Sequence, residues 1–500
     1  MYRKLFTICF VLMSMLAISQ TRDLANMANG KLVFSSIIYD SNDNLFGYLY
    51  LYEKNVTERK KTMEYILLDK NLNEVSNADF EIDVYREVFS KYYDCTLMND
   101  YIILNKYYYY INGFTGNSKP LLTTFQIINL KNNAISNDYI YEDGELNTFT
   151  ADFDKMKKEF KKRESKFVVS CFSNNENNGF IITEDQKKDS YLEKDIRFLG
   201  EDKKLQWSYA YNKDGSEDDY HTFRFLTAKN NNVYIVLRHW KKEGLNPIKM
   251  RDVHIVALDL KTGVEKYRYE VENKDSEFTH TMQAREFDNK LYLVGHYMEN
   301  KTVFTTTYKG FYRTVLSATG EEIDKKYIQW TDYSGQLEID KYGKIGFNNL
   351  LSTVRFFILK DGSVTLLTEK YKTGGYNSVT VTDFILFKTD ASFQQTGVTV
   401  IPKNRSYWSS DFEFYQYIKD DAGVVFFYTD DIKKAKANEA KRILGIVTII
   451  GDEISEEKVP LFTKKQYYIV PMPAKEGYVI LREYNEIDKY NKIRLEKLNY

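Results

Sequence analysis

The sequence predicts an all-β protein folded as a single β-propeller of about eight four-stranded blades. Three observations indicate this fold class. A polar turn followed by a short apolar strand recurs eight times along the 500 residues, further hairpins follow these strands, and tyrosine (42) and phenylalanine (32) are abundant whereas proline (6) is scarce. Aromatic residues favour pleated, half-buried surfaces, and closed all-β folds reach this length as one domain. A ring of seven blades is the alternative.

The recurrent unit begins with a turn of Asn, Asp and Gly, residues that tolerate the positive φ of tight hairpin turns. The intervals between successive strand starts range from 53 residues (Phe180 to Val233) to 79 residues (Tyr101 to Phe180). The eight strands are Phe46–Leu51, Tyr101–Leu104, Phe180–Ile182, Val233–Leu237, Leu291–Val294, Val364–Leu367, Val424–Tyr428 and Tyr478–Leu481.

A second hairpin completes each unit, and Val253–Leu260 followed by the turn Lys261-Thr262-Gly263 is its clearest copy. One four-stranded sheet cannot bury both of its faces, whereas a ring of stacked copies does so. The eighth unit ends one strand short, after Ile493–Leu498. We expect Gln20–Met27 to supply the missing strand and to close the ring with both chain ends in one blade.

Two segments predict short helical insertions in the ring. Ala151–Ser165 carries Phe153, Met156 and Phe160 at helical spacing in a charged background, and Ile432–Lys441 is rich in Ala, Lys and Glu. No linker rich in Pro, Ser and Gly marks a boundary, so we expect residues 20–500 to form one domain.

The N-terminus has the pattern of a secretory signal peptide over residues 1–19. A basic start, Tyr2-Arg3-Lys4, precedes the apolar run Leu5–Ile18, and Ala17-Ile18-Ser19 supplies small residues before the expected cleavage site. A membrane anchor that is retained is the alternative. We therefore expect an exported protein that is periplasmic, associated with an outer membrane or extracellular, with no membrane-spanning segment after the signal is removed.

The stretch Ala257-Leu258-Asp259-Leu260-Lys261-Thr262-Gly263 resembles the repeat of quinoprotein-type propellers. The tryptophan docking motifs of that family are absent, because the chain has four tryptophans and none recurs in phase. The Gly-His and Trp-Asp signatures of WD-type propellers are also missing. The resemblance implies a fold and no active site, since a fold does not determine function.

The balance of 70 basic and 71 acidic residues argues against a nucleic-acid partner. A protein or glycan partner fits better, and Tyr107–Tyr110 is one segment that could stack on sugar rings. Strand alternation would send two of these four tyrosines to each face, where packing between blades is the competing interpretation.

No cofactor is predicted, and calcium is the one metal for which the chain has candidate ligands. Asp40, Asn42 and Asn44 alternate like the oxygen ligands of a calcium loop. The bidentate glutamate of such loops is missing, and the run coincides with a hairpin turn. The polar loop with Asn212, Asp214, Ser216 and Asp218 has the same two interpretations.

Candidate catalytic residues do not stand out. The histidines show no zinc-ligand spacing, although His239 and His296 follow strands at matching places in adjacent units. Cys95 and Cys171 also occupy matching places, where either a disulfide or two buried thiols are possible. No nucleophile elbow or phosphate-binding loop is present. The five histidines are His221, His239, His254, His280 and His296.

We therefore expect an exported, non-catalytic binding or scaffold protein. The first alternative is a glycan hydrolase or lyase that uses carboxylates from distant blades at the centre of the ring. The second alternative is a component of a surface-export machine.

Overall fold

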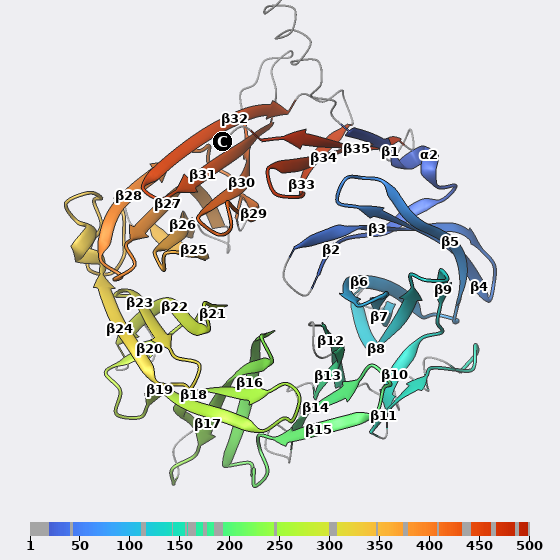
Figure 1. The fold of residues 1–500 in the computed structure, drawn as a ribbon, viewed down its shortest axis with the longest axis horizontal. Helices are drawn as coiled ribbons and strands as arrows, with labels where there is room; N and C mark the ends of the chain where they lie inside the picture. Colours follow the sequence, from blue (N-terminus) through green and yellow to red (C-terminus); the bar gives the residue numbers. More distant parts are fainter. Residues whose placement is uncertain are drawn as a thin grey trace, which may run out of the picture.

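The computed structural model describes residues 20–40, 44–111, 117–142, 144–155, 158, 167–173, 178–184, 194–244, 248–299, 308–346, 349–373, 379–407, 410–432, 442–461, 467–485 and 490–498. In these segments, eight antiparallel sheets surround a central opening as the blades of a propeller (Figure 1). The predicted fold class is confirmed, with eight blades rather than seven.

Each of the first four blades begins with a strand at the centre of the ring and runs outward (Figure 1). Blade 1 contains β2 (Lys31–Tyr39), β3 (Leu45–Val56), β4 (Lys60–Asp69) and β5 (Glu74–Asp83). Blade 2 contains β6 (Phe89–Met98), β7 (Tyr101–Ile111), β8 (Ser118–Asn129), β9 (Ala134–Ile135), β10 (Tyr139–Glu142) and β11 (Glu145–Thr148). Blade 3 contains β12 (Phe167–Ser173), β13 (Asn178–Glu184), β14 (Asp195–Gly200) and β15 (Leu205–Ala210). Blade 4 contains β16 (Asp219–Lys229), β17 (Asn232–Lys241), β18 (Lys249–Asp259) and β19 (Glu265–Asn273).

The remaining four blades follow the same plan. Blade 5 contains β20 (Phe278–His280), β21 (Gln283–Phe287), β22 (Lys290–Glu299), β23 (Gly310–Leu316) and β24 (Glu322–Gln329). Blade 6 contains β25 (Leu350–Ile358), β26 (Val364–Thr373), β27 (Val379–Thr389) and β28 (Gln395–Ile401). Blade 7 contains β29 (Phe412–Ile418), β30 (Gly423–Asp431), β31 (Arg442–Ile450) and β32 (Glu453–Leu461). Blade 8 contains β33 (Tyr468–Pro473), β34 (Tyr478–Asn485), β35 (Tyr490–Lys497) and β1 (Gln20–Asp23).

Two blades depart from the predicted four strands. In blade 5 the inner strand is divided into β20 and β21, which both pair with β22. In blade 2 the short strands β9 and β10 both pair with β8, and β11 extends the sheet outward.

The eight predicted turn-and-strand units are the turns that lead into the second strand of each blade, with strands β3, β7, β13, β17, β22, β26, β30 and β34. Several turn residues adopt the expected positive φ, including Asn99 (53°), Asp288 (50°) and Asp421 (64°). The polar turn residues therefore serve the backbone geometry of these hairpins.

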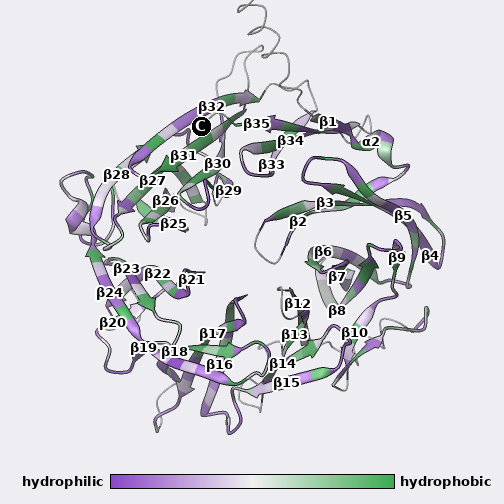
Figure 2. Ribbon diagram, in the orientation of Figure 1, coloured by the Kyte–Doolittle hydropathy of each residue, from purple (hydrophilic) through white to green (hydrophobic). Residues whose placement is uncertain are grey.

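Apolar side chains fill the space between every pair of neighbouring blades. Leu104 of blade 2 packs with Leu51 of blade 1 in one such core, and Phe426 of blade 7 packs with Phe357 of blade 6 in another. Figure 2 shows hydrophobic residues concentrated on the strands within the blades and hydrophilic residues on the connecting loops. Because each blade is covered on both faces, the ring as a whole supplies the core that one blade lacks.

The ring closes as the sequence predicts, within blade 8. Strand β1 pairs with β35 in antiparallel register, with Gln20 opposite Leu495 and Asp23 opposite Lys492. The segment that follows, α2 (Leu24–Met27), is a short helix rather than more strand. Leu24 is fully buried in the core between blades 8 and 1, so the expected strand is correct for the first half of Gln20–Met27.

The two predicted helical insertions fall largely outside the described residues. Of Ala151–Ser165 the structure describes Ala151–Lys155, which form a turn, and Lys158. Of Ile432–Lys441 it describes Ile432, and residues 1–19 also lie outside its range. Among the described helices, none combines the length and the apolar run needed to cross a bilayer.

An aromatic contact joins the outer edges of blades 3 and 4. The Trp207 ring of β15 lies over Gly263, in the turn between β18 and β19, and its Nε1 donates to the Leu260 carbonyl at 2.6 Å. Tyr267 of β19 lies against Gly320 of blade 5 in the same way. The repeat-like stretch Ala257–Gly263 thus receives an aromatic ring from the preceding blade, with tyrosine in place of tryptophan at the next interface.

Candidate functional site

A cavity of about 1120 Å³ occupies the centre of the ring, between the inner strands of blades 1 and 4 to 8. It exceeds the volume of roughly 300–1,000 Å³ that is usual for small-molecule sites, so it has room for a segment of a larger ligand. Its lining is rich in aromatic side chains from three blades: Tyr39, Phe356, Phe412, Phe414, Tyr415 and Tyr417.

Arg285 connects three blades at the wall of this cavity. Its Nη2 lies 2.8 Å from Asp421 Oδ2, its guanidinium lies 3.8 Å from the centroid of the Tyr417 ring, and its Nη1 donates to the Ile358 carbonyl. These contacts link blades 5, 6 and 7. The Asp421 carboxylate also neutralises the charge of the Arg285 guanidinium.

Arg355 presents an available positive charge in the same cavity. Its Nη2 donates to the Tyr415 hydroxyl at 2.8 Å, and its guanidinium lies 4.9 Å from the centroid of that ring. Its side chain is exposed, and within the described chain it forms no ion pair. The hydrogen bond to Tyr415 orients the guanidinium and leaves its charge free for a ligand.

Most carboxylates of the lining are engaged with other residues. Asp421 pairs with Arg285 and Asp420 pairs with Lys360. The remaining two exposed acids accept hydrogen bonds: Glu413 accepts from the Thr429 hydroxyl at 2.9 Å, and Glu476 accepts from the Lys419 backbone N–H at 2.7 Å.

Glu286 differs from these acids because it is buried, with 6% of its surface exposed. Its Oε1 accepts from Asn230 Nδ2 at 3.0 Å, and its Oε2 has no hydrogen-bond partner. Burial raises the pKa of Glu286 above the usual value for a glutamate. It is therefore the lining residue best suited to keep a proton.

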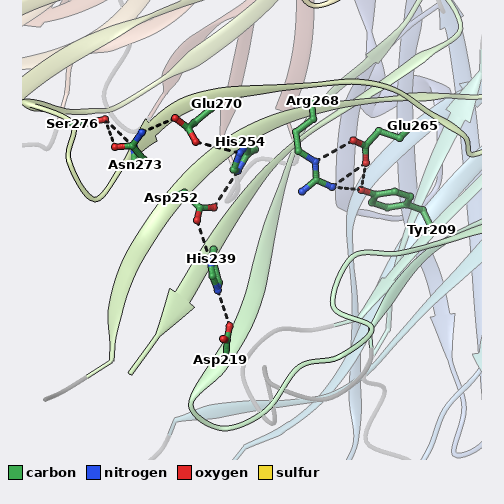
Figure 3. Close-up of polar contacts among 10 residues, drawn as sticks. All are labelled: Tyr209, Asp219, His239, Asp252, His254, Glu265, Arg268, Glu270, Asn273 and Ser276. Carbon is green, nitrogen blue, oxygen red and sulfur yellow. Dashed lines mark hydrogen bonds and ion pairs between the residues drawn. The ribbon is translucent and has the colours of Figure 1, made fainter. Parts of the chain in front are cut away.

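A second polar cluster lies at one end of blade 4, and Figure 3 shows its row of side chains. His239 is held between two carboxylates, with Nε2 at 2.7 Å from Asp219 and Nδ1 at 2.9 Å from Asp252. Asp252 also lies 3.1 Å from His254, and the His221 ring stacks on His239 with centroids 4.6 Å apart. The strand register causes this grouping, because it places His239 opposite His221 and opposite Asp252.

Within the described residues, the row places no serine against an imidazole. Ser276 reaches it through Asn273 and Glu270 rather than through an imidazole (Figure 3). None of the row's residues lines the central cavity. Among the described residues, no group of three or more His, Cys, Asp or Glu could hold a metal ion. We interpret the row as a network that fixes the end of blade 4.

The chain belongs to DUF6770, a family of unknown function. The model of this family matches residues 1–402.

Among curated proteins, no sequence relative was found. A polysaccharide lyase of family PL25, an ulvan lyase, is a similar solved structure, with 8% identity, 81% of this chain and 91% of that chain covered, and a TM-score of 0.37. Prolyl oligopeptidase B from Galerina marginata has 9% identity, coverage of 85% and 47%, and a TM-score of 0.36. A protein of unknown function from Bacteroides caccae has 10% identity, coverage of 64% and 85%, and a TM-score of 0.24. At these identities and scores, none carries an inference about function.

The structure does not bring together His239 and His296, the pair that matches in position along the sequence. His239 stacks on His221 of its own blade, whereas His296 stacks on Tyr308 of blade 5 at 4.3 Å. His280 has separate partners, the Glu272 carboxylate at 3.1 Å and the Tyr327 hydroxyl at 3.0 Å.

The structure describes part of the first candidate calcium loop and all four residues of the second. Asp40 accepts a hydrogen bond from the Asn44 backbone N–H at 2.9 Å, as in a tight turn, and Asn42 lies outside the described residues. In the second loop, Asn212 is buried and its Oδ1 accepts from the His221 backbone N–H at 2.9 Å. Asp214, Ser216 and Asp218 lie along the same loop. Calcium binding stays a prediction for both loops.

The tyrosine run follows the expected alternation. Tyr108 is buried in a core of blade 2, and its hydroxyl donates to Asp138 at 2.5 Å. Tyr107 and Tyr109 lie on the opposite face. Cys95 is a free, buried thiol, so it forms no disulfide with Cys171. Burial raises the pKa of the Cys95 thiol to about 12.

Sequence reasoning missed Arg285, Arg355 and Glu286, the three charged residues that distinguish the cavity. Arg285 and Glu286 lie in the short, mostly polar strand β21, Arg355 lies in β25, and no local motif surrounds any of them. The one available signal was their position on first strands of successive units, which in a propeller line the centre.

Proposed function

We propose that this chain is an exported, non-catalytic binding protein whose central cavity holds a segment of a protein or glycan partner. The observation that carries the proposal is Arg355, an exposed guanidinium that Tyr415 orients and that no described carboxylate neutralises. Arginine in this setting suits a carboxylate or another acceptor group of a ligand. Export rests on the signal-like residues 1–19.

The chemistry of the lining favours binding over catalysis. None of the described lining residues is a histidine, cysteine or serine. Its exposed carboxylates already accept hydrogen bonds or form ion pairs, which reduces their availability as bases or nucleophiles. Aromatic rings beside a guanidinium instead supply apolar contact area together with one polar anchor, as in ligand sites generally.

A glycan hydrolase or lyase is a second candidate, and Glu286 favours it. A buried carboxyl group with a raised pKa has the property that a general acid needs. Glu286 comes from blade 5, while Glu413 comes from blade 7, so the cavity collects carboxylates from separate blades.

One experiment tests both candidates on the chain from Gln20 to Tyr500. Panels of oligosaccharides and peptides are screened for binding by calorimetry and for turnover by product analysis. We expect binding without turnover, and we expect Arg355→Ala to weaken it roughly tenfold or more, since it removes a charge-assisted hydrogen bond. Arg405→Ala is the matched control, because Arg405 lies over the exposed Tyr407 ring outside the cavity.

Turnover that Glu286→Gln abolishes would replace the binding proposal with the enzyme. Equal affinity of the Arg355→Ala variant and the wild type for every ligand that binds would contradict the role of the cavity.

A further inference from the structure

Blade 2 carries an aromatic patch, which consists of the exposed Phe89 and Tyr93 and the half-buried Tyr107 and Tyr109. Phe89 and Tyr93 expose 47% and 46% of their surfaces. The four rings form one connected row, with centroids 5.6 Å apart for Phe89 and Tyr109, 5.6 Å for Tyr109 and Tyr107, and 5.9 Å for Tyr107 and Tyr93. None of these residues lines the central cavity.

The face of β7 that carries Tyr107 and Tyr109 is shared in part with blade 3. The shared part of this face is buried, with Ile103 of β7 packed in one core with Phe180 of β13. Tyr107 and Tyr109 lie further along the same strand, and each is half-buried.

Polar groups accompany the rings. Lys91 lies opposite Tyr107 in the β6–β7 register, and within the described chain its ammonium has no carboxylate partner. The hydroxyls of Tyr107 and Tyr109 donate to no described residue. Two residues before Tyr107, the side-chain oxygen of Asn105 is buried and accepts no hydrogen bond.

We propose that the aromatic patch binds the pyranose rings of a polysaccharide. The C–H faces of a pyranose stack on aromatic rings, and its hydroxyls need donors and acceptors at the edge of the stack. The row of rings supplies the stacking surface. Lys91 and the hydroxyls of Tyr107 and Tyr109 supply the donors and acceptors. A folded protein partner fits less well, because four partly exposed rings fall far below the roughly 800 Å² per partner of a stable interface.

The test measures binding of soluble hexasaccharides of glucose, mannose, N-acetylglucosamine and galacturonic acid to the chain from Gln20 to Tyr500 by calorimetry. We expect at least one to bind. Phe89→Ala and Tyr93→Ala should each weaken that binding roughly fivefold to tenfold. Tyr407→Ala, which truncates an exposed tyrosine elsewhere, should leave the affinity unchanged. A hexasaccharide whose affinity falls with Arg355→Ala but not with Phe89→Ala or Tyr93→Ala binds in the central cavity, and this result overturns the proposal for the patch.

Three further results would overturn the proposal. No hexasaccharide binds, or the patch variants bind as tightly as the wild type. In the third result, Phe89→Ala and Tyr93→Ala lower the melting temperature as far as core substitutions do, which means that another part of this chain covers the rings.

Discussion

His296 shows how packing decides the charge of a single side chain in this ring. Its imidazole is buried, stacks on Tyr308 and lies near Trp330, and its Nδ1 donates to the Gly310 carbonyl at 3.2 Å. Burial lowers the pKa of His296 from 6.5 to about 4. The folded protein therefore holds a neutral imidazole at a pH where the unfolded chain is already protonated.

This difference predicts a pH-dependent stability. Between pH 6.5 and about 4 the unfolded chain binds a proton that the folded protein does not, so stability is present above pH 6.5 and is lost as the pH falls toward 4. From pH 7 to pH 5 His296 should account for a loss of roughly 2 kcal/mol. Urea denaturation of the wild type and His296→Gln at both pH values measures it. An equal loss in the two proteins would disprove this role for His296.

At the scale of single strands and turns, the sequence predicts second strands better than site residues. A second strand such as β30 follows an Asp and Gly turn and is buried along most of its length, so its composition and its boundary are both local signals. The cavity has no such signal. Arg285 and Asp421 meet across 136 residues, and their contact depends on the curvature of the ring.

The outer turns give a prediction with an internal control. Gly263 has a φ of +69°, and a Cβ added there would lie 2.6 Å from the Trp207 ring. Gly451, in the corresponding turn of blade 7, has a φ of +55° and open space around it. Gly451→Ala should cost about 1 kcal/mol of backbone strain, and Gly263→Ala roughly 2–4 kcal/mol, because the ring must also move. Chemical denaturation compares them; similar losses would mean that the Trp207 contact contributes little.

For the whole molecule, closure through β1 and β35 joins eight blades into one ring. Leu24 and Ile493 are fully buried in the core that blade 8 shares with blade 1. Arg22 reinforces this junction, since its Nε donates to the Leu72 carbonyl of blade 1 at 2.7 Å. A destabilising substitution at this junction should therefore lower the free energy of unfolding of the whole ring, and not only unfold the terminal strand.

Leu24→Ala should lower the free energy of unfolding by roughly 2–5 kcal/mol, in one cooperative transition. Leu205→Ala, at an exposed leucine of β15, is the matched control and should change it little. Removal of residues 492–500 should lower the melting temperature further, because it deletes most of β35. If the truncated chain melts like the intact one, β35 does not close the ring.

The pairing of Gln20 with Leu495 has a consequence for how the chain is made. The two residues are 475 positions apart, and their strands meet last if the blades form in the order of synthesis. Until residues 490–497 exist, the edge of β34 and the apolar face of blade 1 have no cover, and both invite association with other chains or attack by proteases. A chain that stops before β35 cannot close the ring and is therefore exposed to degradation.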